Sequence, residues 1–273
     1  LLEAHGKRLL YTSDYNLVET RLLKGADEDY GELDALIIES TYADEDHTER
    51  TTLEKEFVES VNDIVEAGGT VLVPAFSVGR SQEIACILAA YHFEHSVTMD
   101  GMAREASRIL MNNLEYLKDP QLFMDAVHMV NSVEDWKDRR MAVKKPGVII
   151  SPAGMLKGGP APFYVEKIGK KSNNAVFLVG YQIPGTPGRE LLEKGRCVID
   201  GKMRKVKAKV DNFDFSSHAG AKELKETVKK LKGNPTVYVV HGANGNCQKF
   251  AKWVKEEAGF KAEAPKPGEE YIV

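Results

Sequence analysis

The chain has 273 residues and a formal net charge of −4, from 37 Lys and Arg against 41 Asp and Glu. Hydrophobic residues make up 42% and charged residues 29%, which excludes disordered, collagen-like and disulfide-scaffold proteins. The length fits one large domain or two intertwined ones. Because the overall charge is slightly acidic, any polyanionic partner must be met by a local basic surface.

Cysteine usage and hydropathy restrict the cellular setting. Cys86, Cys197 and Cys247 lie far apart with no CxxC spacing, which argues against a disulfide framework and favours a reducing cytoplasm. No apolar run approaches the roughly 18–20 residues of a membrane span, so no membrane partner is expected. The chain opens on Leu1-Leu2 inside an apparent hairpin, and we therefore expect residues to be missing upstream.

The first elements are a hairpin, a buried strand and a helix. A glycine turn separates predicted strands at 1–4 and 8–12. The apolar run 36–38 predicts a buried strand that delivers polar residues at its carboxyl end. Apolar residues at helical spacing from Thr51 to Ala67, stopped by two glycines, predict a helix.

The middle of the chain repeats strand, polar loop and helix, which predicts a doubly wound α/β sheet. The predicted strands are 71–74, 97–99, 148–150 and 175–179. After Arg189, alternation around 197–199, Val206 and Val210 predicts half-buried antiparallel strands. The end of the chain returns to α/β, with helices at 221–232 and 248–258 and a strand at 236–240.

Four polar side chains occupy the same kind of position, the polar end of an apolar strand: Asp14, Glu39, His218 and His241. Two histidines and two carboxylates suit zinc or manganese, and they also suit acid–base chemistry near neutral pH. Each has an ordinary alternative. Asp14 could form a turn or cap a helix, and His218 could be satisfied by backbone. Their recurrence favours a site.

Three glycine-rich loops carry cations and follow predicted strands. Backbone at glycine can approach a phosphate closely, and a nearby cation adds counter-charge, so these loops suit a polyphosphate ligand such as RNA. The alternative is that the glycines permit turns and the arginines lie on the surface. The candidate RNA-binding residues are Arg80, Gly154, Lys157, Gly158, Gly159, Tyr181 and Arg189.

Taken in order, the motifs resemble the β-CASP branch of the metallo-β-lactamase fold, which contains RNase J and the archaeal and eukaryotic pre-mRNA cleavage factors. Residues 11–16 (YTSDYN) are similar to the family's YTGDY element, and residues 38–42 (IESTY) to its ESTY element. Residues 215–219 (FSSHA) and 240–242 (VHG) resemble two later elements. Markers of the inserted domain appear at 74–83, 100–102, 154–159 and 180–182.

The resemblance implies roles for the four site candidates. Asp14 and His241 would be metal ligands, in a complete protein that holds two zinc ions. His218 would donate a proton to the leaving oxygen and Glu39 would orient it. The family's HxHxDH motif, which supplies most zinc ligands, is absent from these 273 residues. Ser13 stands where the family has Gly, and Gly220 where an Asp is common.

The implied fold is the C-terminal portion of a metallo-β-lactamase αββα core, at 1–43 and 215–273, with a doubly wound β-CASP domain inserted at 44–214. The expected function is zinc-dependent hydrolysis of RNA phosphodiester bonds, impaired unless upstream ligands are present. RNA is the expected partner, and family members commonly dimerise. The alternatives are a non-catalytic RNA-binding or scaffold subunit, and a hydrolase acting on a small molecule.

Overall fold

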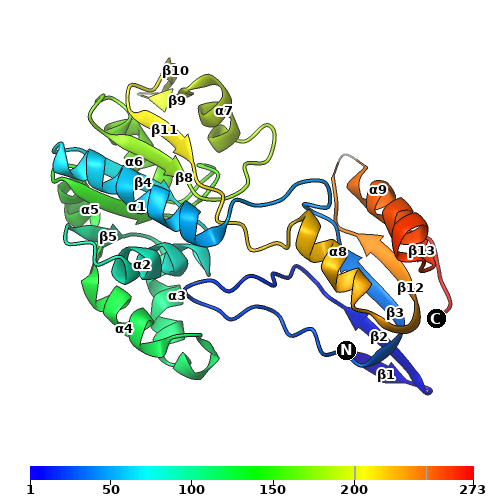
Figure 1. Ribbon diagram of the computed structural model, residues 1–273. Helices are drawn as coiled ribbons and strands as arrows, with labels where there is room; N and C mark the ends of the chain where they lie inside the picture. Colours follow the sequence, from blue (N-terminus) through cyan, green and yellow to red (C-terminus); the bar gives the residue numbers. More distant parts are fainter. Residues whose placement is uncertain (200, 244) are drawn as a thin grey trace. The chain divides into compact units, whose positions relative to one another are not determined.

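A computed structural model describes residues 1–199, 201–243 and 245–273 (Figure 1). The chain divides into two compact units. Unit 1 comprises residues 1–19, 25–47 and 217–273, and unit 2 comprises residues 20–24 and 48–216. The α/β class expected from the sequence is confirmed. The expected boundaries at 43/44 and 214/215 remain predictions.

Unit 1 is built on a mixed sheet with strand order β1-β2-β3-β12-β13. β1 and β2 pair antiparallel, whereas the pairs β2–β3, β3–β12 and β12–β13 are parallel. The strands are β1 (Leu2–Ala4), β2 (Lys7–Tyr11), β3 (Glu32–Glu39), β12 (Lys232–Val240) and β13 (Ala262–Glu263). The helices are α8 (Ala221–Lys229), α9 (Asn246–Trp253) and the π-helical turn η2 (Val254–Ala258).

The core of unit 1 lies between this sheet and its helices. Leu36, Ile38 and Val239 are fully buried with Leu224 of α8 and Phe250 of α9. Leu36 and Ile38 are two residues apart, so they project from the same face of β3. Burial of these apolar faces fixes the register of β3 on β12, and with it the height at which both strands end.

Unit 2 contains a six-stranded sheet with the order β11-β8-β4-β7-β5-β6, parallel throughout. The strands are β4 (Thr70–Pro74), β5 (Val97–Met99), β6 (Val130–Ser132), β7 (Gly147–Ser151), β8 (Ala175–Leu178) and β11 (Lys209–Asn212). A separate antiparallel pair consists of β9 (Arg196–Ile199) and β10 (Lys202–Lys205).

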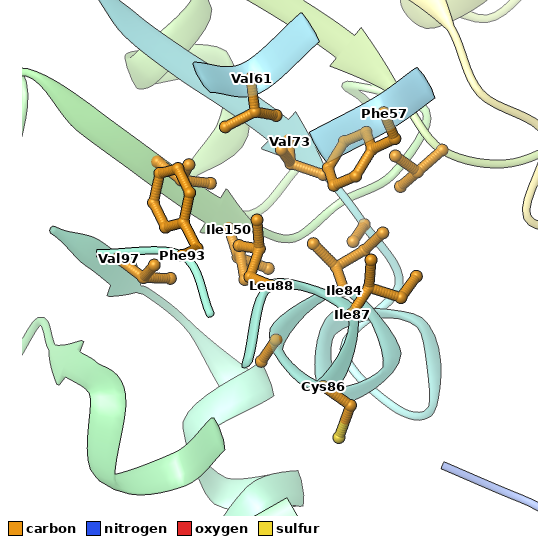
Figure 2. Packing of buried hydrophobic residues seen from close by; sticks show 14 of the residues in the cluster. Phe57, Val61, Val73, Ile84, Cys86, Ile87, Leu88, Phe93, Val97 and Ile150 are labelled. Carbon is orange, nitrogen blue, oxygen red and sulfur yellow. The ribbon is translucent and has the colours of Figure 1, made fainter. Parts of the chain in front are cut away.

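Helices cover both faces of the unit 2 sheet. They are α1 (Arg50–Glu66), α2 (Arg80–Ala90), α3 (Met102–Met111), η1 (Leu114–Tyr116), α4 (Pro120–Met129), α5 (Trp136–Ala142), α6 (Ala161–Ile168) and α7 (Pro187–Lys194). Val73 and Ile150 face α1 and α2, and Figure 2 shows Phe57 and Ile84 pointing toward this face. Leu72 faces the opposite cluster, which includes residues of α6 and α7.

One strand of this sheet differs from the sequence prediction. The strand around Val210, β11, was expected to be antiparallel, but it pairs parallel with β8 inside the six-stranded sheet. The alternation around Val210 reflects an edge position, since an edge strand is half-solvated whatever its direction, whereas Val206 is buried in the connection between β10 and β11. The antiparallel expectation is confirmed only for β9 and β10.

Candidate active site

The four site candidates all lie in unit 1, where the structure brings them together. One ligand atom from each of Asp14, Glu39, His218 and His241 lies within 4.8 Å of every other. Glu39 ends β3 and His241 directly follows β12, which is paired with β3 so that Val240 lies opposite Glu39. Parallel strands that end at one edge of a sheet therefore deliver both side chains to the same place.

The backbone has unusual conformations at the ends of these strands. His241 has a φ of +51°, a conformation that non-glycine residues adopt rarely and that clusters at functional sites. Ser13 also has a positive φ, +52°, which explains why glycine suits this position of the YTGDY element. A side chain at Gly242 would meet the Ser40 hydroxyl at 2.3 Å, so the two strand ends approach each other at a residue that must be small.

His218 departs from the expected placement at a strand end. It lies in the loop between β11, which ends at Asn212, and α8, which begins at Ala221. The adjoining Ala219 donates its N–H to the Tyr15 carbonyl at 2.7 Å, which fixes the loop beside the segment that carries Asp14. Hydrogen bonding of the loop, rather than a sheet, therefore positions this histidine.

Glu39 and His218 form a close, directed pair. The Glu39 carboxylate is 1% exposed, and its Oε2 lies 2.7 Å from Nδ1 of His218. The other oxygen, Oε1, accepts the Tyr15 N–H at 3.0 Å. Burial alone would raise the pKa of the Glu39 carboxyl, but hydrogen bonds from His218 and Thr41 outweigh burial, and the net shift of the pKa is downward.

The charge state of Glu39 sets the tautomer of His218. An ionised carboxylate only accepts hydrogen bonds, so Nδ1 of His218 carries the proton that is donated to it. This leaves Nε2 as the nitrogen that can gain or release a proton toward a bound molecule. The arrangement is that of a general acid–base histidine oriented by a buried carboxylate.

Asp14 and His241 form the exposed half of the cluster. Nδ1 of His241 lies 3.3 Å from Oδ1 of Asp14, and these side chains are 56% and 58% exposed. The two imidazoles of His218 and His241 stack with their centroids 5.7 Å apart. Accessible imidazole and carboxylate groups are the ligand types that zinc and manganese prefer.

Two neighbouring residues contribute contacts that the sequence did not assign. The Thr41 hydroxyl lies 3.0 Å from Nδ1 of His241 and donates to its carbonyl at 3.2 Å. The other residue is His47, whose Nε2 lies 3.1 Å from the His218 carbonyl and whose ring packs against Tyr42. Thr41 is two residues beyond Glu39, so its proximity to the strand end was the available signal.

The four side chains form a single cluster of potential metal ligands. Asp14 and His241 offer accessible ligand atoms, whereas Glu39 and His218 already bind each other. Two ligands do not complete the four-coordinate shell of an ordinary zinc site. In the ranges that the structure describes, no second cluster of potential metal ligands accompanies this one.

The candidate RNA-binding residues lie in unit 2, after strands β4, β7 and β8, which are neighbours in the sheet. Arg80 begins α2 and Arg189 lies in α7, where it pairs with Glu193 at 2.7 Å. Lys157 is exposed in the loop after β7, and Tyr181 is 46% exposed in the loop after β8.

Hydrogen bonds join these loops at one edge of the sheet. Gln182 donates from Nε2 to the Gly154 carbonyl at 3.3 Å, and Gly188 donates its N–H to the Met155 carbonyl at 2.9 Å. Gly159 has a φ of +62°, and a Cβ there would lie 2.7 Å from the Pro152 carbonyl oxygen, so the turn requires glycine. The glycines of the loop thus have a structural role whether or not they contact phosphate.

Comparison with known proteins agrees with this geometry. Residues 81–191 match the model of the Beta-Casp domain, and residues 203–265 match that of the Zn-dependent metallo-hydrolase RNA specificity domain. The chain therefore belongs to the β-CASP family of metallo-β-lactamase-fold proteins, as the motifs indicated.

Its relatives include archaeal proteins named as RNases. The chain is 45% identical to RNase aCSPSF2 of Saccharolobus solfataricus, over 96% of this chain and 53% of that protein. It is 37% identical to a Methanocaldococcus jannaschii protein named "Probable RNase MJ4", over 97% of this chain and 63% of the relative. It is 31% identical to transcription termination factor FttA of Pyrococcus horikoshii, over 93% of this chain and 43% of the relative. The chain thus spans about half to two thirds of the first two relatives.

Within the described ranges, no helix combines the length and apolar character needed to cross a membrane. The relatives' names and the family models do not address dimerisation or cellular location, and both remain predictions.

Proposed function

We propose that this chain provides the proton-transfer half of a metal-dependent ribonuclease site. The observation that carries the proposal is the Glu39–His218 pair, with Nδ1 to Oε2 at 2.7 Å, beside the exposed Asp14 and His241. Names of relatives as RNases support RNA as the substrate class. RNA processing or decay follows as the expected setting.

In this proposal each residue has a separate task. Asp14 and His241 would hold zinc, which supplies Lewis-acid polarisation of the phosphate and neutralises developing charge when it is bound. As a water molecule attacks phosphorus and the bond to the departing ribose oxygen breaks, His218, with Nδ1 held by Glu39, gives the proton from Nε2 to that oxygen. Glu39 stabilises the positively charged imidazole before that transfer and fixes the ring orientation.

Because only two accessible metal ligands are available, we expect these 273 residues on their own to have weak activity. We expect cleavage of a labelled single-stranded RNA to rise strongly in an extended protein, in which the chain is joined to a segment that carries the family's HxHxDH motif, because that motif would complete the metal shell. An extended protein that binds zinc and RNA but cleaves nothing would instead favour the non-catalytic RNA-binding subunit.

Substitutions of the pair test the assignment. In the extended protein, His218→Ala should lower the cleavage rate constant by about 10²–10⁴-fold, which is the usual contribution of a general acid. Glu39→Gln should also slow cleavage and displace the pH–rate profile, because the amide no longer stabilises the imidazolium. His95→Ala, at an exposed histidine of unit 2, is the matched control.

Zinc content is measured in parallel by elemental analysis. Asp14→Ala and His241→Ala should lower it, whereas His218→Ala should leave it nearly unchanged. If His218→Ala cleaves RNA as fast as the His95→Ala control, the proton-donor role is wrong. If zinc content is unaffected by removal of both Asp14 and His241, the ligand assignment is wrong.

A further inference from the structure

Basic residues are concentrated in one stretch of unit 2. Residues 136–171 contain nine Lys and Arg but two Asp and Glu, whereas the rest of the chain has 28 basic and 39 acidic residues. The basic residues are Lys137, Arg139, Arg140, Lys144, Lys145, Lys157, Lys167, Lys170 and Lys171. Apart from the partly buried Arg139, all of these are exposed. The stretch is therefore strongly basic within an otherwise acidic chain, and this composition favours contact with a polyanion.

An aromatic and cationic cluster lies within this stretch. Trp136, the first residue of α5, is 57% exposed and meets Phe163 of α6 edge to face, with ring centroids 5.5 Å apart. The Arg139 guanidinium lies 4.5 Å from the centroid of the Trp136 ring, and the Lys167 ammonium lies 5.7 Å from that of Phe163. We call these four residues the aromatic platform.

Buried contacts hold the platform rigid. Both nitrogens of the Arg139 fork donate to Asp100, Nε to Oδ2 at 2.6 Å and Nη2 to Oδ1 at 2.9 Å. The Tyr164 hydroxyl donates to the same carboxylate at 2.7 Å. Asp100 directly follows β5 and is 1% exposed, so the Arg139 side chain is held in one position at the end of the sheet.

The platform adjoins the glycine-rich loop that follows β7. The Phe163 N–H donates to the carbonyl of Pro160, the last residue of that loop, at 3.0 Å. A Cβ at Gly101, next to Asp100, would lie 3.3 Å from the Pro160 ring. The platform is therefore at the carboxyl edge of the unit 2 sheet, where α/β folds bind their ligands.

We infer that the aromatic platform binds single-stranded RNA by stacking a base on Trp136, while the exposed Lys137 and Arg140 of the same helix and Lys157 of the adjoining loop contact the phosphates. An exposed, rigid aromatic ring backed by a cation within a basic segment is the combination that recognises unpaired bases. A purely electrostatic surface would not need the tryptophan, and a purely apolar contact would not need the excess of cations. The inference deepens the proposed function, on which it rests for the choice of RNA.

The test uses the intrinsic fluorescence of Trp136. The chain has two tryptophans, so Trp253→Phe leaves Trp136 as the only reporter. Titration of this variant with a ten-nucleotide oligoadenylate should quench its emission. In the wild-type background, Trp136→Ala should weaken binding by about 5- to 150-fold, the range expected for loss of one stacked base. Tyr116→Ala, at an exposed aromatic of the same unit, should not weaken it.

Inorganic polyphosphate separates stacking from charge. Trp136→Ala should bind it as wild type does, whereas the double variant Lys137→Gln, Arg140→Gln should bind both polyphosphate and RNA more weakly. Equal RNA affinity of the Trp136→Ala and Tyr116→Ala variants would overturn the platform. Binding of the oligoadenylate without quenching of the Trp136 emission would also overturn it. If Trp136 is quenched but the extended protein cleaves no RNA, the platform stands and the nuclease proposal fails. If the extended protein cleaves RNA but Trp136 is not quenched, the nuclease proposal stands and the platform fails.

Discussion

At the scale of single residues, one buried carboxylate organises a segment distant from it in sequence. Glu83 of α2 accepts the backbone N–H groups of Arg21 and Leu22 at 2.8 and 2.7 Å, and it also pairs with Arg50 of α1. Residues 20–24 are thereby held in unit 2 although the chain on either side of them belongs to unit 1. A sequence pattern does not show this, because the partners are about 60 residues away.

The contacts of Glu83 predict a large effect of its removal. We expect Glu83→Ala to lower the free energy of unfolding by roughly 3–5 kcal/mol, because it leaves two backbone donors unpartnered and removes one of the two carboxylates that pair with the partly buried Arg50, the other being Glu54. Urea unfolding followed by circular dichroism measures the change. Glu105→Ala removes an exposed carboxylate paired with Arg108 and should leave stability nearly unchanged. Equal effects of both substitutions would contradict the prediction.

Single residues also show how much of the candidate site the sequence predicts. Asp14, Glu39, His218 and His241 were selected from their positions near strand ends and from the family motifs, and the structure brings their side chains together. Only the family resemblance implied that Glu39 orients His218, because the local sequence contains no periodic signal for the loop between β11 and α8 that brings them together. The roles of the four residues remain predictions.

At the scale of elements, strong periodicity gave accurate predictions and short or charged segments did not. The helix expected at 51–67 is α1, Arg50–Glu66, with the Glu49 side chain accepting the first N–H groups. α4, β6 and α5 were not predicted. The reason for α5 is physical, since its seven residues contain no fully buried side chain and read as a charged loop.

The packing of α1 on the sheet explains why its signal was strong. Phe57 is fully buried, and its ring lies 6.4 Å from that of Phe177, 5.3 Å from Phe213 and 5.4 Å from Phe215 (Figure 2 shows Phe57 at the core). These three partners come from β8 and from the segment that follows β11. One side chain of α1 therefore contacts both β8 and the segment that follows β11.

We expect Phe57→Ala to lower the free energy of unfolding by about 3–5 kcal/mol, because it leaves a cavity among rings that cannot all collapse into it. Phe57→Leu should cost less, since more of the volume remains filled. Urea denaturation provides the measurement, with Glu59→Ala on the exposed face of α1 as control. A Phe57→Ala variant as stable as the control would show that α1 is not held by this cluster.

At the scale of the whole molecule, unit 2 is an insertion in unit 1. The chain leaves unit 1 at His47 and returns at Ser217, and these points are close, since Nε2 of His47 lies 3.1 Å from the His218 carbonyl. An inserted domain with adjacent ends and its own core commonly folds alone. Two buried clusters, one on each face of the six-stranded sheet, consist almost wholly of residues 48–216.

We therefore expect a fragment of residues 48–216 to unfold cooperatively in urea, at a lower midpoint than the corresponding transition of the whole chain. The fragment lacks residues 20–24, so it loses the buried Leu22 and the two N–H groups that Glu83 accepts. Glu83→Ala should consequently cost less in the fragment than in the whole chain, because part of what it breaks is already gone.

The comparison of these two costs separates independent folding from mutual support. A smaller cost in a cooperative fragment means that unit 2 is a domain to which residues 20–24 add stability. An equal cost means that Arg50, and not the 20–24 segment, is the partner that matters to Glu83. A fragment without a cooperative transition means that unit 2 needs the rest of the chain to fold, and that the insertion is a feature of topology alone.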